Sequence, residues 1–232
     1  TGTHLLTRAI TLLTNKDPYN RWERSLPLNL LKECLTEANK TGRFLHSHLI
    51  YEKETKEALE LEGYRIVFLL RDPRDQLISM LFYINDKGWG YKKLNRTLPF
   101  GLLPFDDQIE EMITGKLFGT SVPEDFIVNR LGWKNTGLTV YFENLVGEKG
   151  GGNNLLQLAE LKRLASYLNI SIADEALNAI ANQVFGWEGL TTFRSGQIGS
   201  WKKHFTERHK QLFKEIYGEE LIRLGYESDF NW

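Results

Sequence analysis

The apolar residues of the chain follow two spacings, and these predict its helices and strands. From residue 3 to residue 13 (THLLTRAITLL) they recur every three or four positions, which predicts an amphipathic helix. Residues 64–70 (YRIVFLL) form a nearly continuous apolar run, typical of a buried parallel strand. Similar patterns predict strands at 44–49 and 138–142, helices at 28–38, 53–61, 73–87, 106–116, 124–131, 154–168 and 173–184, and further helices toward the C-terminus.

Strands that alternate with helices define the fold class. They predict an α/β domain of three layers, with a mainly parallel sheet flanked by helices. The length of 232 residues suits one domain. Because a helix begins almost at Thr1, with no strand before its glycine turn, we expect residues 1–232 to be a single domain whose first strand precedes Thr1.

Charge and composition narrow the classes of partner. There are 29 Lys and Arg against 30 Asp and Glu, so the net charge of -1 gives no global basic field for nucleic acid or anionic lipid. Any anion must therefore be bound by a local site. The single cysteine, Cys34, excludes an intrachain disulfide and Cys-rich zinc sites, and we expect it to be buried. No apolar run approaches the roughly 18 residues of a membrane span.

The segment RDPRDQLIS, residues 71–79, is the strongest candidate for chemistry. Arg71 leaves the most apolar strand at its carboxyl end, where open α/β sheets bind ligands, and its guanidinium suits a phosphate. Ser79 lies away from the apolar stripe of the following helix. The pair predicts phosphate binding, and the alternative is a surface arginine paired with Asp75.

Two glycine-bearing segments could also hold an anion. In residues 193–202 (FRSGQIGSWK) two glycines permit turns with positive φ, Arg194 supplies charge, and Trp201 would anchor the loop. Residues 1–4 (TGTH) form a turn at a helix N-terminus. Taken alone, each segment is more simply explained as an ordinary connecting loop.

His46 and His48 lie on the short strand at 44–49. A period of two puts both imidazoles on one face, and His48 comes at the carboxyl end, where a general base would act. The alternatives are a hydrogen-bonded structural histidine and a metal pair. Because the other histidines show no ligand spacing to this pair, we expect no metal.

Together these segments resemble the sulfotransferases that use 3′-phosphoadenosine-5′-phosphosulfate (PAPS) and release 3′-phosphoadenosine-5′-phosphate (PAP), which have a P-loop-like α/β fold. Residues 71–79 resemble the family's 3′-phosphate segment, residues 193–202 its Arg-Lys-Gly-x-x-Gly-Asp-Trp-Lys signature, and residues 1–3 the end of its Pro-Lys-Ser-Gly-Thr loop. The resemblance implies a 3′-phosphate site of Arg71, Ser79, Arg194, Ser195 and Gly196, and a 5′ site of Thr1, Gly2, Thr3 and His4. It also implies that His48 is the catalytic base and that Phe142 lies near the adenine.

Several positions depart from the family pattern. Ser195 replaces the lysine of the signature, Ser200 its aspartate, His46 a lysine two positions before the base, and Leu5 a tryptophan that stacks on the adenine. The loop lysine that stabilises the bridging oxygen is not in the sequence. The family's dimerisation segment is only partly kept, at Lys202, Thr206 and Glu207, which leaves the oligomeric state open.

The leading hypothesis is in-line sulfuryl transfer from PAPS to a hydroxyl group. The irregular residues 88–104 carry Trp89, Tyr91 and Phe100, which would line a site for a hydrophobic small-molecule alcohol or phenol, unless this stretch packs on its own core. A non-catalytic nucleotide-binding relative is the alternative. A P-loop phosphotransferase is disfavoured, because Gly2 is followed by Thr3 rather than by Lys-Ser/Thr. The resemblance to the cytosolic branch implies a cytoplasmic location.

Overall fold

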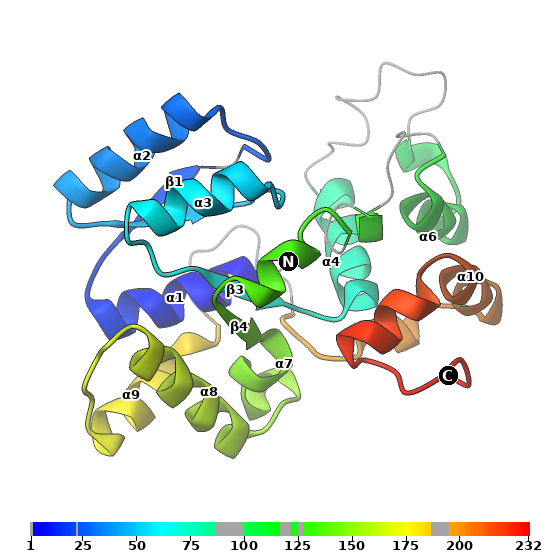
Figure 1. Cartoon of the computed structure of the whole chain (residues 1–232). Helices are drawn as coiled ribbons and strands as arrows, with labels where there is room; N and C mark the ends of the chain where they lie inside the picture. The colour runs from blue at the N-terminus through cyan, green and yellow to red at the C-terminus, as the bar shows by residue number, and fades with distance from the viewer. Residues whose placement is uncertain (1, 22, 87–99, 117–121, 125–127, 187–194) are drawn as a thin grey trace. The chain divides into compact units, whose positions relative to one another are not determined.

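The computed structural model describes residues 2–21, 23–86, 100–116, 122–124, 128–186 and 195–232 (Figure 1). These residues form two compact units. The first unit holds the described parts of residues 71–128 and 199–232, and the second holds those of residues 2–70 and 129–198. Among the described residues, no helix combines the length and the apolar character needed to cross a membrane.

The strands of the second unit pair in parallel. Strand β1 (Pro18–Arg21) pairs with β2 (Phe44–Ser47), and β3 (Val67–Leu70) pairs with β4 (Leu138–Tyr141). This confirms the predicted class, an α/β fold with parallel strands flanked by helices. The sequence patterns did not predict strand β1, whose backbone pairs with β2 in the register Pro18 to Phe44.

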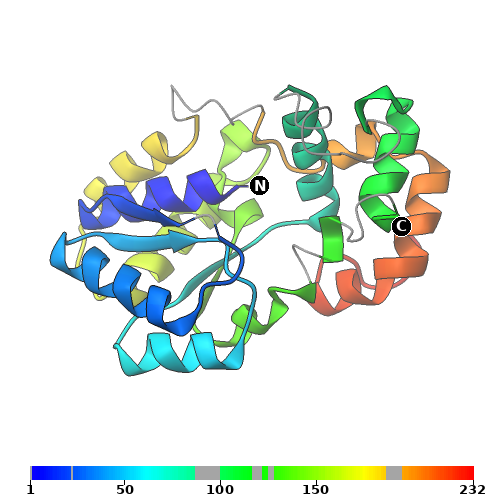
Figure 2. The ribbon, with the colours of Figure 1, turned by 90° about the horizontal axis from the view of Figure 1, so that it is seen from above.

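Helices cover both faces of these strands (Figures 1 and 2). Strand β3 shows why: Val67 and Leu69 pack against one hydrophobic cluster and Phe68 against another, as the alternation of side chains along a strand requires. The first cluster lies among α1, α7, α8, α9 and β4, and the second lies among α2 and α3. The bounds are α1 (Thr3–Thr14), α2 (Leu28–Lys40), α3 (Lys53–Leu61), α7 (Phe142–Leu145), α8 (Asn154–Tyr167) and α9 (Asp174–Val184), with the 3-10 helices η3 (Leu131–Asn135) and η4 (Glu148–Gly150).

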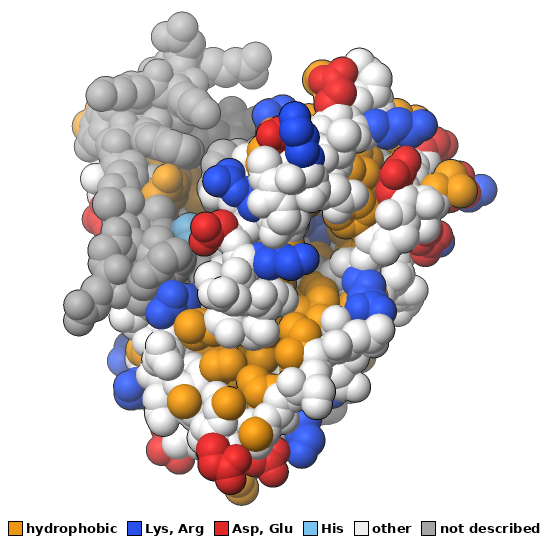
Figure 3. All heavy atoms as spheres, turned by 90° about the vertical axis from the view of Figure 1, so that its left-hand side faces the viewer, with side chains coloured by type: hydrophobic (Ala, Val, Ile, Leu, Met, Phe, Trp, Pro, Cys, Tyr) orange, Lys and Arg blue, Asp and Glu red, His pale blue; other side chains and the backbone are white. Residues whose placement is uncertain are grey.

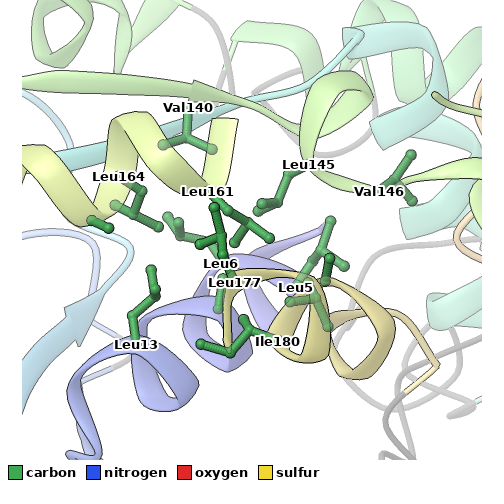
Figure 4. Close-up of a cluster of buried hydrophobic side chains, with 14 of the residues drawn as sticks. Leu5, Leu6, Leu13, Val140, Leu145, Val146, Leu161, Leu164, Leu177 and Ile180 are labelled. Atoms are coloured by element: carbon green, nitrogen blue, oxygen red, sulfur yellow. The ribbon is translucent and has the colours of Figure 1, made fainter. Parts of the chain in front are cut away.

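Helix α1 is fixed by the first cluster. Figure 4 shows its leucines and those of α8 and α9 pointing toward one another, beneath Val140 of β4. Leu6, Ala9 and Leu13 of α1 are buried, as the helical spacing predicted, and Leu5 is buried with them. Burial of a leucine side chain contributes on the order of 2 kcal/mol. The packing therefore holds the N-terminal turn of α1 at a defined place beside the strands.

The first unit is helical in its described residues. It contains α4 (Pro73–Asp86), η1 (Phe100–Leu102), α6 (Phe105–Thr114), η5 (Ser200–Lys203) and α10 (Glu207–Leu224). Its hydrophobic cluster joins the apolar stripe of α4 to Trp201 and to Phe213 of α10. Helix α10 begins with a capping box, in which Thr206 accepts from the His209 amide and the Thr206 amide donates to His209 Nδ1. The helix predicted at 124–131 falls partly outside the described residues, and residues 129 and 130 form a turn instead.

Candidate functional site

The turn at Gly2 lies in the second unit and starts helix α1. Gly2 has a φ of 88°, and its carbonyl accepts from the Leu5 amide at 3.0 Å. A Cβ atom at Gly2 would lie 2.7 Å from Cδ2 of Phe142, whose ring is 3% exposed. The first turn of α1 contains no acidic residue, so its positive end is not neutralised locally. Gly2 and Phe142, which the sequence assigns to one nucleotide site, are thus in contact.

Replacing Gly2 by alanine should destabilise the protein through two effects. An alanine at positive φ costs about 1–2 kcal/mol, and the Phe142 ring must also move to admit the new methyl group. Gly42→Ala is a matched control, since Gly42 has a φ of 67° with nothing within 4 Å of its Cβ position. Urea denaturation should show a larger loss for Gly2→Ala than for Gly42→Ala, and equal losses would contradict the contact with Phe142.

His46 and His48 lie together at the carboxyl end of β2, as their spacing predicted. Their ring centroids are 5.8 Å apart, and Nδ1 of His46 is 2.9 Å from Oδ1 of Asn20 on β1. Burial, followed by the positive charge of His4, lowers the pKa of His46 to about 4. Burial also lowers the pKa of His4. The imidazoles of His46 and His4 are therefore neutral at physiological pH.

Arg130 is a neighbour of His48 that the sequence did not reveal. The segment that carries it is held against the residues after His48, because Asn129 accepts from the Tyr51 amide at 2.7 Å and Trp133 Nε1 donates to the Leu49 carbonyl at 3.0 Å. Burial, and then the charge of Arg130, lowers the pKa of His48 to about 3. No local sequence pattern identifies Arg130 as a neighbour of His48, because only the tertiary fold brings its segment beside β2.

The neutral imidazole of His48 can accept a proton, as a general base must. Its low pKa describes the protein without a ligand, in which buried surroundings and Arg130 disfavour the imidazolium. A bound anion close to His48 would have the opposite electrostatic effect and raise the pKa. In the ligand-free protein His48 is therefore a weak base, and a bound polyanion nearby would make it a stronger one.

The histidine pKa values predict a loss of stability in acid. Below pH 6.5 the unfolded chain takes up protons at His46 and His48, whereas the folded protein does so only near pH 4 and 3. The free energy of unfolding should therefore fall between pH 7 and pH 5, by about 2 kcal/mol for each histidine. Urea denaturation at both pH values measures this change. His48→Gln should remove about half of the loss, and an unchanged loss in that variant would contradict the assignment.

In the first unit, Asp75 joins the start of α4 to a distant segment. The Asp75 carboxylate is fully buried and accepts from the amides of Gly199 and Trp201, at 2.7 and 2.9 Å, and from Oγ of Ser200, at 3.1 Å. Burial raises the pKa of Asp75, and the charge of Arg71 and the two amides oppose that rise. The predicted anchoring role of Trp201 is confirmed, because its side chain is buried and its amide is bound.

Arg71 is buried, with 4% of its surface exposed, and this contradicts the alternative of a surface arginine. It follows β3 directly and precedes the first turn of α4. Ser79 lies on α4 and is half-buried. The opposite charge of Asp75 offsets part of the cost of burying this guanidinium, and its place at the carboxyl end of β3 keeps Arg71 a candidate anion ligand.

The remaining candidates are placed as follows. In the second unit Gly196 has a φ of 61°, the left-handed turn that the sequence predicted, and nearby the Ile198 amide donates to the Gly150 carbonyl at 3.0 Å. In the first unit Phe100 is fully buried in the hydrophobic cluster, so an acceptor would reach it only after its neighbours move. Ser195 and Thr3 are half-buried in the second unit.

Four predicted residues lie outside the described part of the chain: Thr1, Trp89, Tyr91 and Arg194.

Side chains of both charge signs are mixed on one face of the second unit (Figure 3). On the face of the second unit drawn in Figure 3, Lys and Arg side chains alternate with Asp and Glu side chains around exposed hydrophobic ones. Cys34 is buried, as expected. In the described ranges, no three His, Cys, Asp or Glu side chains are grouped to hold a metal ion.

Comparison with known proteins identifies the family. The family profile described as "Sulfotransferase domain" matches residues 29–225. The mouse protein Sulfotransferase 2A6 is 22% identical over 95% of this chain and 81% of its own length, and the Cavia porcellus 3-alpha-hydroxysteroid sulfotransferase is 23% identical over 100% and 83%.

Solved structures agree on the fold. Mouse sulfotransferase SULT7A1 complexed with PAP has a TM-score of 0.66 at 18% identity, covering 95% of this chain and 80% of that one. Retinol dehydratase in complex with androsterone and inactive cofactor PAP has a TM-score of 0.53 at 17% identity, covering 84% and 60%. The chain belongs to the sulfotransferase family, a family of transferases.

Proposed function

We propose that this protein transfers the sulfuryl group of PAPS to the hydroxyl group of a hydrophobic small molecule. The observation that carries the proposal is the binding of residues 199–201 to Asp75, four residues after the buried Arg71. It links, within one unit, the 71–79 segment to the end of the 193–202 segment, and both segments resemble parts of the family's 3′-phosphate site. Two sulfotransferase-fold structures with PAP bound support the choice of nucleotide.

The nucleotide would be held by groups from several separate segments of the chain. Arg71 and Ser79, with Arg194, Ser195 and Gly196, would bind the 3′-phosphate through charged hydrogen bonds and backbone amides. Thr1, Gly2, Thr3 and His4 would surround the 5′-phosphosulfate at the positive end of α1. Phe142 would contribute to the adenine site from beneath the Gly2 turn.

The reaction would be an in-line displacement at sulfur. The acceptor oxygen forms a bond to sulfur while the bond from sulfur to the phosphate oxygen breaks, and PAP leaves with the electron pair of that bond. His48 takes the acceptor proton at a ring nitrogen that is neutral beforehand. The charge that develops on the leaving phosphate would be stabilised by the amides at the start of α1.

The proposed acceptor is an alcohol or a phenol on an apolar skeleton. Trp89 and Tyr91 would provide the apolar wall of its site, and Phe100 would join them only if its neighbours in the cluster moved. Two relatives carry names that fit this class: one is a 3-alpha-hydroxysteroid sulfotransferase, and retinol dehydratase was solved with androsterone.

Calorimetry with PAP followed by a transfer assay tests the proposal. Wild-type protein should bind PAP and should transfer labelled sulfate from PAPS to at least one member of a panel of sterols, alcohols and phenols. Binding of PAP without transfer to any acceptor would favour the non-catalytic alternative. No binding of PAP would refute the nucleotide site.

A further inference from the structure

The guanidinium of Arg74, in the first turn of α4, is held at a junction of three segments. Its side chain is 3% exposed, and Nε and Nη2 donate to the Asp72 carboxylate at 3.0 and 2.8 Å. Nη1 donates to the carboxylate of Glu227, from the residues after α10. Arg74 therefore bonds to its own turn and to the C-terminal tail, residues 226–232.

Two tryptophans complete this junction. The Arg74 guanidinium carbon lies 4.1 Å from the ring centroid of Trp201 and 4.5 Å from that of Trp232. The two rings are nearly perpendicular, at 86°, with centroids 5.8 Å apart, so the guanidinium occupies the corner between them. Cation–π attraction is strengthened by such burial. The tail thus reaches Trp201 through Arg74 and through direct ring contact.

The tail is itself packed on α10. The Phe230 ring occupies the space where a side chain at Gly218 would lie, 2.4 Å from its Cβ position. Nζ of Lys214 lies 4.9 Å from the Trp232 ring centroid, and the Phe213 ring lies 6.4 Å from it. These contacts give Trp232 a fixed place against the junction.

The first turn of α4 consequently holds residues 199–201 by two neighbouring side chains. Asp75 binds their amides, and Arg74 packs on the Trp201 ring. Arg71 precedes the same turn. Movement of the tail would therefore loosen Trp201 on one side while Asp75 still bound it on the other.

We propose that Glu227 and Trp232 are positioning residues, which order the 199–201 segment and the Arg71 turn for the 3′-phosphate through Arg74. The inference rests on the proposed function, since it assumes that these segments bind PAP. Neither residue needs to touch the nucleotide. Loss of the Trp232 ring should weaken PAP binding and leave the rate of transfer at saturating PAPS unchanged, because His48 belongs to a different part of the chain.

Variants at Trp232 test the expected effect of its ring on PAP binding. Trp232→Leu keeps apolar volume but removes the aromatic face, Trp232→Phe restores a face, and Asn231→Ala alters an adjacent exposed residue. Calorimetry should show PAP affinity reduced about threefold to thirtyfold in Trp232→Leu, with near wild-type affinity in the other two proteins. Equal affinity in all four proteins would overturn the proposal.

Amide hydrogen exchange in nucleotide-free protein separates this inference from the proposed function. The Gly199 and Trp201 amides, which donate to Asp75, should exchange faster in Trp232→Leu than in Asn231→Ala. Unchanged exchange would overturn the positioning role whether or not PAP binds. If wild-type protein does not bind PAP, the proposed function fails, and exchange alone decides whether the tail orders residues 199–201.

Discussion

Replacing His48 by alanine should lower the rate of sulfuryl transfer by about 10²- to 10⁴-fold, the usual contribution of a general base. The acceptor hydroxyl would then lose its proton to water rather than to a positioned imidazole. PAP affinity should stay within about twofold of the wild-type value, because His48 would face the acceptor and not the 3′-phosphate. Single-turnover assays with labelled PAPS, together with calorimetry, measure the two quantities separately.

His204→Gln is the control for this result. His204 lies in the first unit, with its ring 5.3 Å from that of Phe82, and it has no proposed role in transfer. A His48→Ala enzyme with weakened PAP binding and intact turnover would contradict the assignment of His48 as the base.

A spectroscopic measurement adds an independent check on His48. The pKa of about 3 in the free protein should rise when PAP binds, because the phosphate charge favours the imidazolium that Arg130 and burial disfavour. NMR titration of the imidazole with and without PAP would detect the change. A pKa that does not move would place His48 away from the nucleotide.

Replacing Arg71 by alanine should weaken PAP binding by about 10- to 150-fold. A hydrogen bond to a charged group is worth about 1.5–3 kcal/mol, and the buried position of Arg71 limits screening by water. Calorimetry at two salt concentrations should show a smaller salt dependence for the variant, since one charged contact is lost. Arg71→Lys should give intermediate affinity, because it keeps the charge but loses the planar fork.

The matched control is Arg208→Ala. Arg208 is exposed and pairs with Glu110 on the surface of the first unit, so its loss should leave the PAP affinity unchanged. Because Arg71 also faces Asp75, each variant should first be shown to be folded by circular dichroism. A folded Arg71→Ala protein with wild-type affinity would remove Arg71 from the nucleotide site.

Local patterns were sufficient for much of the fold and for part of the site. The apolar run ending at Leu70 gave strand β3, and the period of two along β2 brought His46 and His48 to one face. Both depend only on neighbours in the chain, as does the left-handed turn at Gly196. The family resemblance depended on the same short segments, and the match over residues 29–225 confirmed it.

Other features depend on partners far away in the chain. Strand β1 has four residues and begins at Pro18, so only its pairing with β2 makes it a strand. Asp75 interacts electrostatically with Arg71, as one alternative interpretation had it, but its oxygens also bind residues 124 to 126 positions later, which no local pattern predicts. Arg130 lowers the pKa of His48 because the chain path brings its segment beside β2.

The sequence by itself determined the α/β class, the family and the residue types of the candidate site, because helix and strand periodicity and short motifs are local properties. Only the tertiary structure decided that Arg71 is buried, that Asp75 holds residues 199–201, and that the tail reaches Arg74. Burial and long-range hydrogen bonds depend on which distant segments meet. The packing of the whole chain decides which distant segments come into contact, and the sequence of a single segment does not specify this.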